Sequence, residues 1–326
     1  MAYRALALVA AALLVPALAA GQSPAGGEAE GTPYEPPRTP WGAPDLQGIW
    51  TLNDAHGIPF ERADEDAGKT LLTEDEALAR RERTTLRSIW GYDREWRDTA
   101  LGFVRTAPSR QVAVIIDPSD GKLPPMTPEA RERVPVMLAE RRAVELAAEN
   151  PEDLGSWERC ATRGLPALMV PNGYNNGVQI VQGPGFVAVT KEMIHETRII
   201  PTDGREHLGE DLTLWLGDSV GRWEGDTLVV EVTNFNGKAD SFHGTSANMR
   251  LTERFTRVDE DTIEYEFTVD DPTVWTRPWT GMLPMKRDDG QYELVEYACH
   301  EGNYGMFNML SGARAKEQAA AAAESK

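Results

Sequence analysis

The sequence predicts a mainly β fold: an antiparallel meander forming a barrel or sandwich, calycin-like, with two helical insertions in the N-terminal half. The first observation is that short runs of β-forming residues follow one another from 178 to 304. The second is period-two alternation, in which Ile263, Tyr265 and Phe267 share an apolar face opposite polar residues. This alternation is typical of a sheet with one face packed on the core and the other exposed to solvent. The third is the short Asp/Gly turns between runs, such as 288–290, which favour hairpins over βαβ units.

The N-terminus predicts export. Arg4 precedes an apolar run, and residues 1–20 have the features of a cleavable signal peptide. Residues 21–40 are rich in Gly, Pro, Ala and Glu and predict a disordered spacer. The apolar run is interrupted by Pro16, and no later run approaches the length of a membrane span. We therefore expect a periplasmic or secreted protein without membrane insertion.

The composition excludes some partners. The formal net charge is −19, and such an acidic surface repels nucleic acid and anionic lipid. We expect a single β-rich domain over 41–314, with the helical insertion at about 73–150 and an Ala-rich tail, helical or frayed, over 315–326. The oligomeric state is not predicted.

Two helices are expected in the insertion. Thr73 and Glu76 have capping-box spacing at the start of a helix that runs to about Ile89. Thr127 is the expected N-cap of a second helix, from Pro128 to about Glu149. Its charged, Ala-rich content predicts an exposed helix, which Pro135 could split or kink.

The strands are bounded by Gly, Pro, Asp and Asn, residues that favour turns. Each run between these turns is rich in β-branched and aromatic residues. The predicted strands are, in order, Gly48–Leu52, Gln111–Ile116, Val178–Gln182, Phe186–Lys191, Ile194–Ile200, Arg222–Trp223, Thr227–Val232, Met249–Val258, Thr262–Asp270, Trp275–Lys286 and Tyr292–His300.

Two carboxylates fall in apolar rows of these strands. Glu253 lies on the face of Leu251 and Phe255, and Glu296 lies on the face of Leu294 and His300. If the rows point inward, burial raises the pKa of each carboxyl, which suits general acid–base catalysis with His195 or His300. Each carboxylate could instead pair with a buried arginine, for which the candidates are Arg198, Arg222, Arg250 and Arg277.

A polar segment and several aromatic residues predict ligand binding. The amide groups of a short stretch suit polar ligands such as sugar hydroxyls, although they are also typical of turns. Trp275 and Trp279 share a strand face, where they could form an aromatic wall or pack in the core. The candidate ligand-binding residues are Tyr174, Asn175, Asn176, Gln179, Arg198, His207, His243 and Trp275.

The histidines and cysteines complete the candidate sites. No pair of the five histidines has a zinc-binding spacing, so no cofactor is predicted, with a divalent metal as the alternative. Cys160 and Cys299 could form one disulfide, remain as two buried thiols, or supply one reactive thiol. The motifs of serine hydrolases, NTPases, thioredoxins and dinucleotide enzymes are absent from the sequence.

Several motifs resemble those of a known family. They are Asp45–Trp50 (DLQGIW), Tyr174–Gln182 (YNN followed by QIVQ), Arg222–Val230 (RWEGDTLVV) and Cys299–Gly305 (CHEGNYG). Together they resemble a large family of exported bacterial proteins, usually labelled hypothetical. The resemblance covers nearly the whole mature chain and implies export and a shared fold, but no activity. More remotely, Gly48-Ile49-Trp50 resembles the first strand of lipocalin-like calycins, in which the tryptophan plugs one end of the barrel.

Two functions are consistent with these observations. The first is an exported protein that binds a small molecule in a cavity of the barrel or sandwich. The alternative is a lyase, isomerase or hydrolase that acts on a carbohydrate or aromatic metabolite in that cavity. The enzyme requires Glu253, Glu296, His195 and His300 to face one cavity, whereas carboxylates that are locked to arginines or lie apart count against it.

Overall fold

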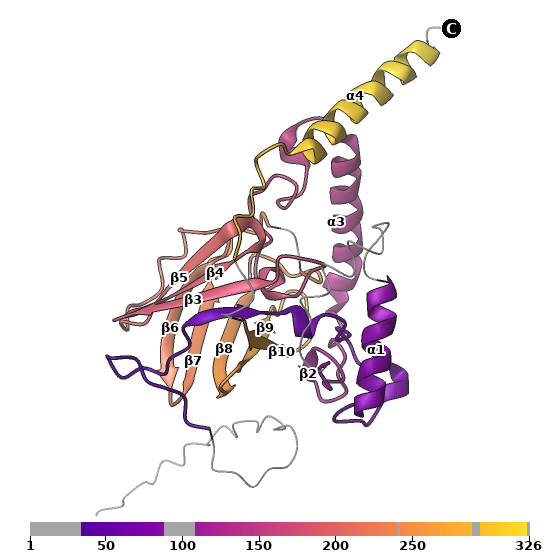
Figure 1. Cartoon of the computed structure of the whole chain (residues 1–326). Coiled ribbons are helices and arrows are strands. Elements are labelled where there is room, and N and C mark those ends of the chain that lie inside the picture. The colour runs from indigo at the N-terminus through magenta and orange to yellow at the C-terminus, as the bar shows by residue number, and fades with distance from the viewer. Residues whose placement is uncertain (1–33, 88–107, 240–241, 289–293, 325–326) are drawn as a thin grey trace, which may run out of the picture. The chain divides into compact units, whose positions relative to one another are not determined.

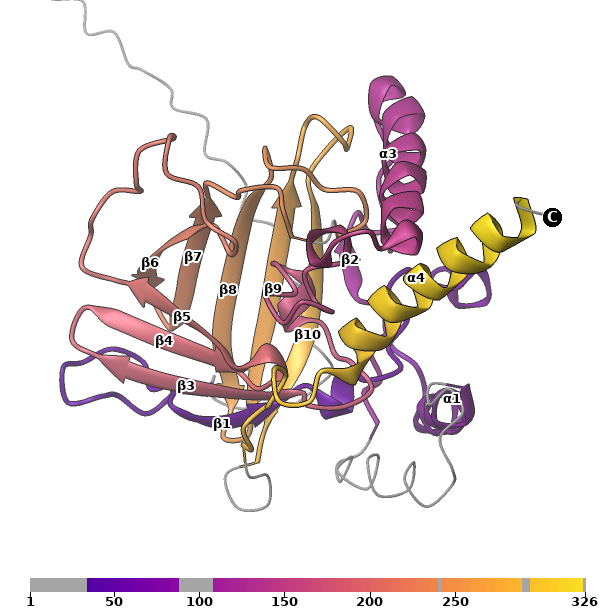
Figure 2. The same ribbon diagram turned by 90° about the horizontal axis from the view of Figure 1, so that it is seen from above.

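The strands form one antiparallel sheet that curls into a nearly closed barrel (Figures 1 and 2). The computed structural model describes residues 34–87, 108–239, 242–288 and 294–324. The expected signal peptide and most of the spacer lie outside these residues. The strand order is β5-β4-β3-β1-β10-β9-β8-β7-β6, with β2 paired to β10. The mainly β barrel predicted from the sequence is therefore confirmed.

The bounds of the strands and helices follow the turn residues closely. The strands are β1 Gly48–Thr51, β2 Ile115–Asp117, β3 Gly177–Gly183, β4 Phe186–Lys191, β5 Glu196–Pro201, β6 Asp218–Glu224, β7 Thr227–Thr233, β8 Arg250–Asp259, β9 Thr262–Asp270 and β10 Trp279–Arg287. The helices are α1 Glu74–Arg87, α3 Pro128–Ala147 and α4 Tyr304–Glu324, with short 3₁₀ turns at Asn53–Ala55, Asp64–Asp66, Pro151–Asp153, Ala167–Met169 and Met193–His195.

The predicted helix starts have the expected caps. Thr73 and Glu76 exchange side-chain-to-backbone hydrogen bonds of 2.8 and 3.2 Å before α1. The Oγ1 of Thr127 accepts a hydrogen bond from the Ala130 amide at the start of α3. Pro135 lies in the interior of α3 without interrupting it. None of the described helices is long and apolar enough to cross a membrane.

Apolar side chains from all sides fill the barrel interior. The buried cluster includes residues of β1, β3, β4 and β7 to β10. Trp50 is fully buried near the end of the barrel where β8 ends and β9 begins. Its indole Nε1 donates to the Leu46 carbonyl, and the guanidinium groups of Arg257 and Arg287 lie 5.6 and 5.3 Å from its ring centroid.

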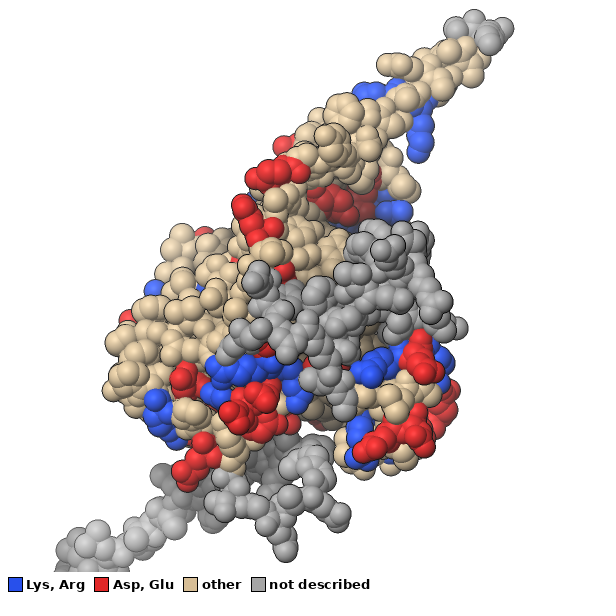
Figure 3. All heavy atoms as spheres, in the orientation of Figure 1, with Lys and Arg blue, Asp and Glu red and all other residues tan. Residues whose placement is uncertain are grey.

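On the face seen in Figure 3, acidic and basic side chains lie next to one another, and α4 presents mostly uncharged residues. The net charge of −19 is therefore not gathered into a patch of one sign on this face.

Several predicted strands differ from the structure in their bounds. The strand expected over Ile194–Ile200 begins at Glu196, and Arg222–Trp223 belong to a longer strand, Asp218–Glu224. Three others differ as follows. The strand expected over Gln111–Ile116 begins only at Ile115. The amides of Val114 and Ile115 bond the carbonyls of Pro59 and Phe60 in an irregular loop. The strand expected from Trp275 begins at Trp279, just after Pro278, which has no amide hydrogen for a ladder.

The third is the predicted last strand. Tyr292 lies outside the described residues, and residues 294–300 form no strand. β10 pairs with β9 on one side, and on the other side with β2 at its start and with β1 at its end. It therefore has no continuous free edge with which they could pair.

The two edge strands of the sheet, β5 and β6, lie next to each other. We call this junction the seam, and its close approach requires a glycine in β6. A Cβ added to Gly221 of β6 would lie 2.8 Å from Ile200 Cγ2 and 3.0 Å from Thr202 Cγ2 of the facing edge. The two edges can therefore approach this closely only because position 221 has no side chain.

Replacing Gly221 with valine is expected to lower the free energy of unfolding by about 1–3 kcal/mol, the usual range for overpacking. Urea denaturation would measure it. Gly209→Val is the matched control, since a Cβ at Gly209 meets no atom within 4 Å. Equal stability of the two variants would show that the seam tolerates a side chain.

Candidate functional site

Glu253 is fully buried in the barrel and is bound to an arginine. Arg198 of β5 makes a two-pronged ion pair with it across the interior, in which Nη2 donates to Oε1 at 2.9 Å and Nη1 donates to Oε2. The Tyr265 hydroxyl donates to Oε1 at 2.8 Å. Burial alone would lower the pKa of Arg198, but Glu253 raises it above its ordinary value. Burial, reinforced by Glu253, raises the pKa of Tyr265 well above its ordinary value. Of the four candidate arginines, Arg198 is therefore the partner of Glu253.

The other three acid–base candidates lie apart from Glu253. Glu296 and His300 are exposed in the irregular segment that replaces the predicted last strand. His195 is exposed at the end of a 3₁₀ turn, not in a strand, and its Nδ1 contacts the Tyr297 carbonyl at 2.9 Å. The expectation that Glu296 and His300 share an inward face is wrong, because that face requires a strand.

The amide-rich segment forms a bonded turn. Asn176 is buried, and its Nδ2 donates to Asn53 Oδ1 at 3.0 Å and to the Asn172 carbonyl at 2.7 Å. Asn175 has a positive φ of 54°, and its Nδ2 donates to Glu192 Oε1 at 2.9 Å. These bonds favour the turn interpretation for the two asparagines.

The remaining ligand-binding candidates are distributed over the surface and the core. Gln179 and Tyr174 are exposed. The Nδ1 of His207 lies 2.8 Å from Asp218 Oδ2, and His243 stacks on Phe60 with ring centroids 4.2 Å apart. Trp275 is buried and packs edge-on against Trp279, which favours its core role.

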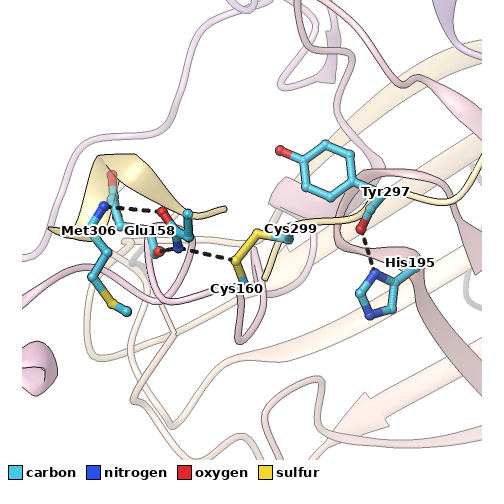
Figure 4. Close-up of a disulfide and its surroundings, with 7 residues drawn as sticks. Glu158, Cys160, His195, Tyr297, Cys299 and Met306 are labelled. Carbon is cyan, nitrogen blue, oxygen red and sulfur yellow. Dashed lines mark hydrogen bonds between the residues drawn. A yellow bond between two sulfur atoms is a disulfide. The ribbon is translucent and has the colours of Figure 1, made fainter. Parts of the chain in front are cut away.

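The structure joins Cys160 and Cys299 in a disulfide, with their Cα atoms 5.8 Å apart (Figure 4). Among the residues that the structure describes, no group of three or more His, Cys, Asp or Glu side chains could hold a metal ion.

A cavity lies at the barrel end opposite Trp50. Its volume is about 550 Å³, within the usual range of small-molecule sites. Phe235, just beyond β7, and Met249, just before β8, line it together with Leu165. Because Arg257 at the far end of β8 packs on Trp50, this cavity occupies the other mouth of the barrel. We call it the mouth cavity.

One face of α3 forms the wall of the mouth cavity. Val134, Met137, Leu138 and Arg141 recur at the i, i+3, i+4, i+7 spacing of a single helix face, and all line the cavity. Arg133 lines it too, so two arginines adjoin a surface that is mostly apolar with a few polar side chains. Arg141 also pairs with Glu145 at 3.3 Å, and Arg133 donates to the Thr273 carbonyl at 3.1 Å. Such a surface suits a ligand with an apolar body and a negatively charged group.

The prediction that α3 is an exposed helix is confirmed, since only Ala130 and Val134 of it are buried. The part of α3 that lines the cavity was not identified from the sequence. The signal was present in the helical spacing of Val134, Met137 and Leu138. Lys191, whose side chain is buried, with 1% of the residue exposed, was also not identified from the sequence. Lys191 follows Val187 and Val189 at period two in β4, so the alternation places it on the inner face.

Lys191 is a buried base with few partners for its ammonium. Its Nζ donates to the Asn175 carbonyl at a long 3.4 Å. Burial lowers the pKa of Lys191 to about 7, Glu192 opposes this shift and Arg163 adds to it. Buried lysines are neutralised in this way when no carboxylate is close enough to hold the charge.

Comparison with known proteins gives no relative: no family model matches the chain, and no curated protein matches its sequence.

Proposed function

We propose that this is an exported small-molecule-binding protein whose ligand, an apolar molecule with a carboxylate group, binds in the mouth cavity. The observation that carries the proposal is the position of that cavity. It lies at one end of a filled barrel whose other end contains the buried Trp50, and two arginines adjoin its mostly apolar wall. A β-barrel with a cavity at its mouth is a common ligand-binding architecture.

Two observations support export. The expected signal peptide precedes the barrel, and the disulfide between Cys160 and Cys299 is of a kind that persists in oxidising compartments.

The alternative of a lyase, isomerase or hydrolase needed four residues in one cavity. Glu253 is bound to Arg198 inside the barrel, while His195, Glu296 and His300 are exposed elsewhere. The geometry therefore favours binding over acid–base catalysis by these residues.

The test is a ligand screen with medium-chain fatty acids and aryl carboxylic acids, each compared with the matching alcohol. Thermal shift and the fluorescence of Trp215, which lines the cavity, are the readouts. Carboxylates are expected to bind more tightly than their alcohols, and Arg133→Gln with Arg141→Gln to reduce that difference. Arg142→Gln is the control, since Arg142 is exposed and does not line the cavity. If no carboxylate binds, the proposal fails.

A charge in the wall gives a sharper prediction. Leu138→Glu is expected to weaken carboxylate binding by roughly tenfold or more, because it places a like charge beside the ligand. Leu138 is 44% exposed, so the fold should tolerate the change. Val136→Glu is the matched control: it is 55% exposed on the same helix but does not line the cavity. Titration calorimetry would measure both, and equal affinities would place the ligand elsewhere.

A further inference from the structure

A second cavity, of about 470 Å³, lies beside the disulfide. We call it the clasp site and define it by three aromatic residues, Trp157, Tyr174 and Tyr297, and two polar residues, Glu158 and Asn303. All five line the cavity, and the disulfide-bonded Cys299 lines it too. It does not share a lining residue with the mouth cavity.

The clasp site is assembled from three segments that are far apart in the sequence. Trp157 and Glu158 precede Cys160, Tyr174 begins the turn before β3, and Tyr297 and Asn303 belong to the C-terminal segment. The last segment lies outside any strand between 294 and 299, so no sheet ladder positions it.

Three side-chain links hold the C-terminal segment in place instead (Figure 4). The first is the disulfide. The second is the contact of 2.9 Å between His195 Nδ1 and the Tyr297 carbonyl. The third is Asn303, whose Nδ2 donates to the Glu158 carbonyl at 2.8 Å while its Oδ1 accepts from the Met306 amide at the start of α4. Only the disulfide among these is covalent, so the geometry of the site depends chiefly on it.

The chemistry of the lining indicates the ligand. The guanidinium carbon of Arg163 lies 4.4 Å from the centroid of the Trp157 ring and covers one face of it. Aromatic rings bind the apolar faces of sugar rings, while a carboxylate and phenol hydroxyls bond sugar hydroxyls. The carboxylate of Glu158 in the lining disfavours an anionic sugar.

We propose that the clasp site binds one ring of a neutral saccharide, and that the disulfide between Cys160 and Cys299 holds the site in its binding geometry. This inference is independent of the ligand proposed for the mouth cavity.

Titration calorimetry with maltose, cellobiose and N,N′-diacetylchitobiose tests the saccharide. Binding of at least one of them to the intact protein is expected. Tyr174→Ala should weaken it by roughly tenfold, the effect of losing one stacking ring. Tyr304→Ala is the control, since Tyr304 is 75% exposed in the same C-terminal segment but does not line the cavity. Failure of all three sugars to bind, or equal binding by the two variants, overturns the proposal.

The role of the disulfide is tested with the double variant Cys160→Ser, Cys299→Ser. Circular dichroism and thermal unfolding establish that the barrel is folded at the temperature of the titration. A folded double variant that has lost at least tenfold in saccharide affinity supports the proposed role. A folded variant that binds like the unaltered protein removes the disulfide from the proposal. If the variant does not fold, the comparison of Tyr174→Ala with Tyr304→Ala still decides the site.

Discussion

Replacing Glu253 with alanine is expected to lower the free energy of unfolding by about 3–5 kcal/mol, the usual result of removing one partner from a buried ion pair. The guanidinium of Arg198, which is 7% exposed, would lose its two charged contacts in the barrel interior. The Tyr265 hydroxyl would lose its acceptor as well. Denaturant unfolding near pH 7 measures the change.

The matched control is an ion pair of the same kind on the outside of the barrel. Arg222 and Glu231 of the neighbouring strands β6 and β7 are about half exposed. Glu231→Ala is therefore expected to change stability by only about 0–1 kcal/mol. The double variant Arg198→Met, Glu253→Leu should recover much of the lost stability, because apolar side chains can replace a buried pair. A loss in Glu253→Ala no larger than in Glu231→Ala would contradict a buried pair.

The position of this pair explains why the interior of the barrel is not the proposed ligand site. It links β5, at one edge of the sheet, to β8, the third strand from the other edge. It thus spans the seam between β5 and β6 from inside. With aromatic and aliphatic side chains packed around it, the space for a small molecule is at the mouth, beside α3.

The hairpins could be predicted because their signals are local. The structure has β4 at Phe186–Lys191 and β9 at Thr262–Asp270, the bounds that alternation and turn residues predict. The same alternation between 292 and 300 predicts a strand that the described part of this segment does not form. A strand needs a neighbouring strand with a free edge as well as a suitable residue pattern. The pairing of β10 with β1 and β2, which are far away in the sequence, cannot be read from the local pattern.

The candidate site was less predictable for the same reason. The sequence shows Glu253 in an apolar row and several arginines that could pair with it. Only the register of the sheet brings Arg198, 55 residues away, to its carboxylate. The clasp site is harder still to predict from the sequence. Trp157 and Tyr297 line the same cavity because a disulfide joins their two segments, and its cysteines are 139 residues apart.

Replacing Lys191 with methionine is expected to stabilise the protein, by an amount that depends on pH. The pKa of Lys191 is lowered by burial from 10.5 to about 7 in the folded state. Between about pH 7 and 10.5 the unfolded chain holds a proton that the folded chain has released, so the stability of the unaltered protein rises with pH across this window. Below about pH 7 both states are protonated, and the full cost of the buried charge is present.

The gain from Lys191→Met is therefore largest at about pH 6, on the order of 3–5 kcal/mol, and disappears towards pH 10.5. Methionine has a similar length and fills the same space without an ammonium, and the bond it removes is the long one to Asn175. Lys238→Met, at an exposed position, should change stability by less than about 0.5 kcal/mol at every pH. Denaturant unfolding of both variants at pH 6, 8 and 9.5 tests whether the gain from Lys191→Met falls with pH while Lys238→Met stays neutral. A gain that is constant with pH would mean that the ammonium of Lys191 is stabilised in the barrel and that its pKa is not lowered.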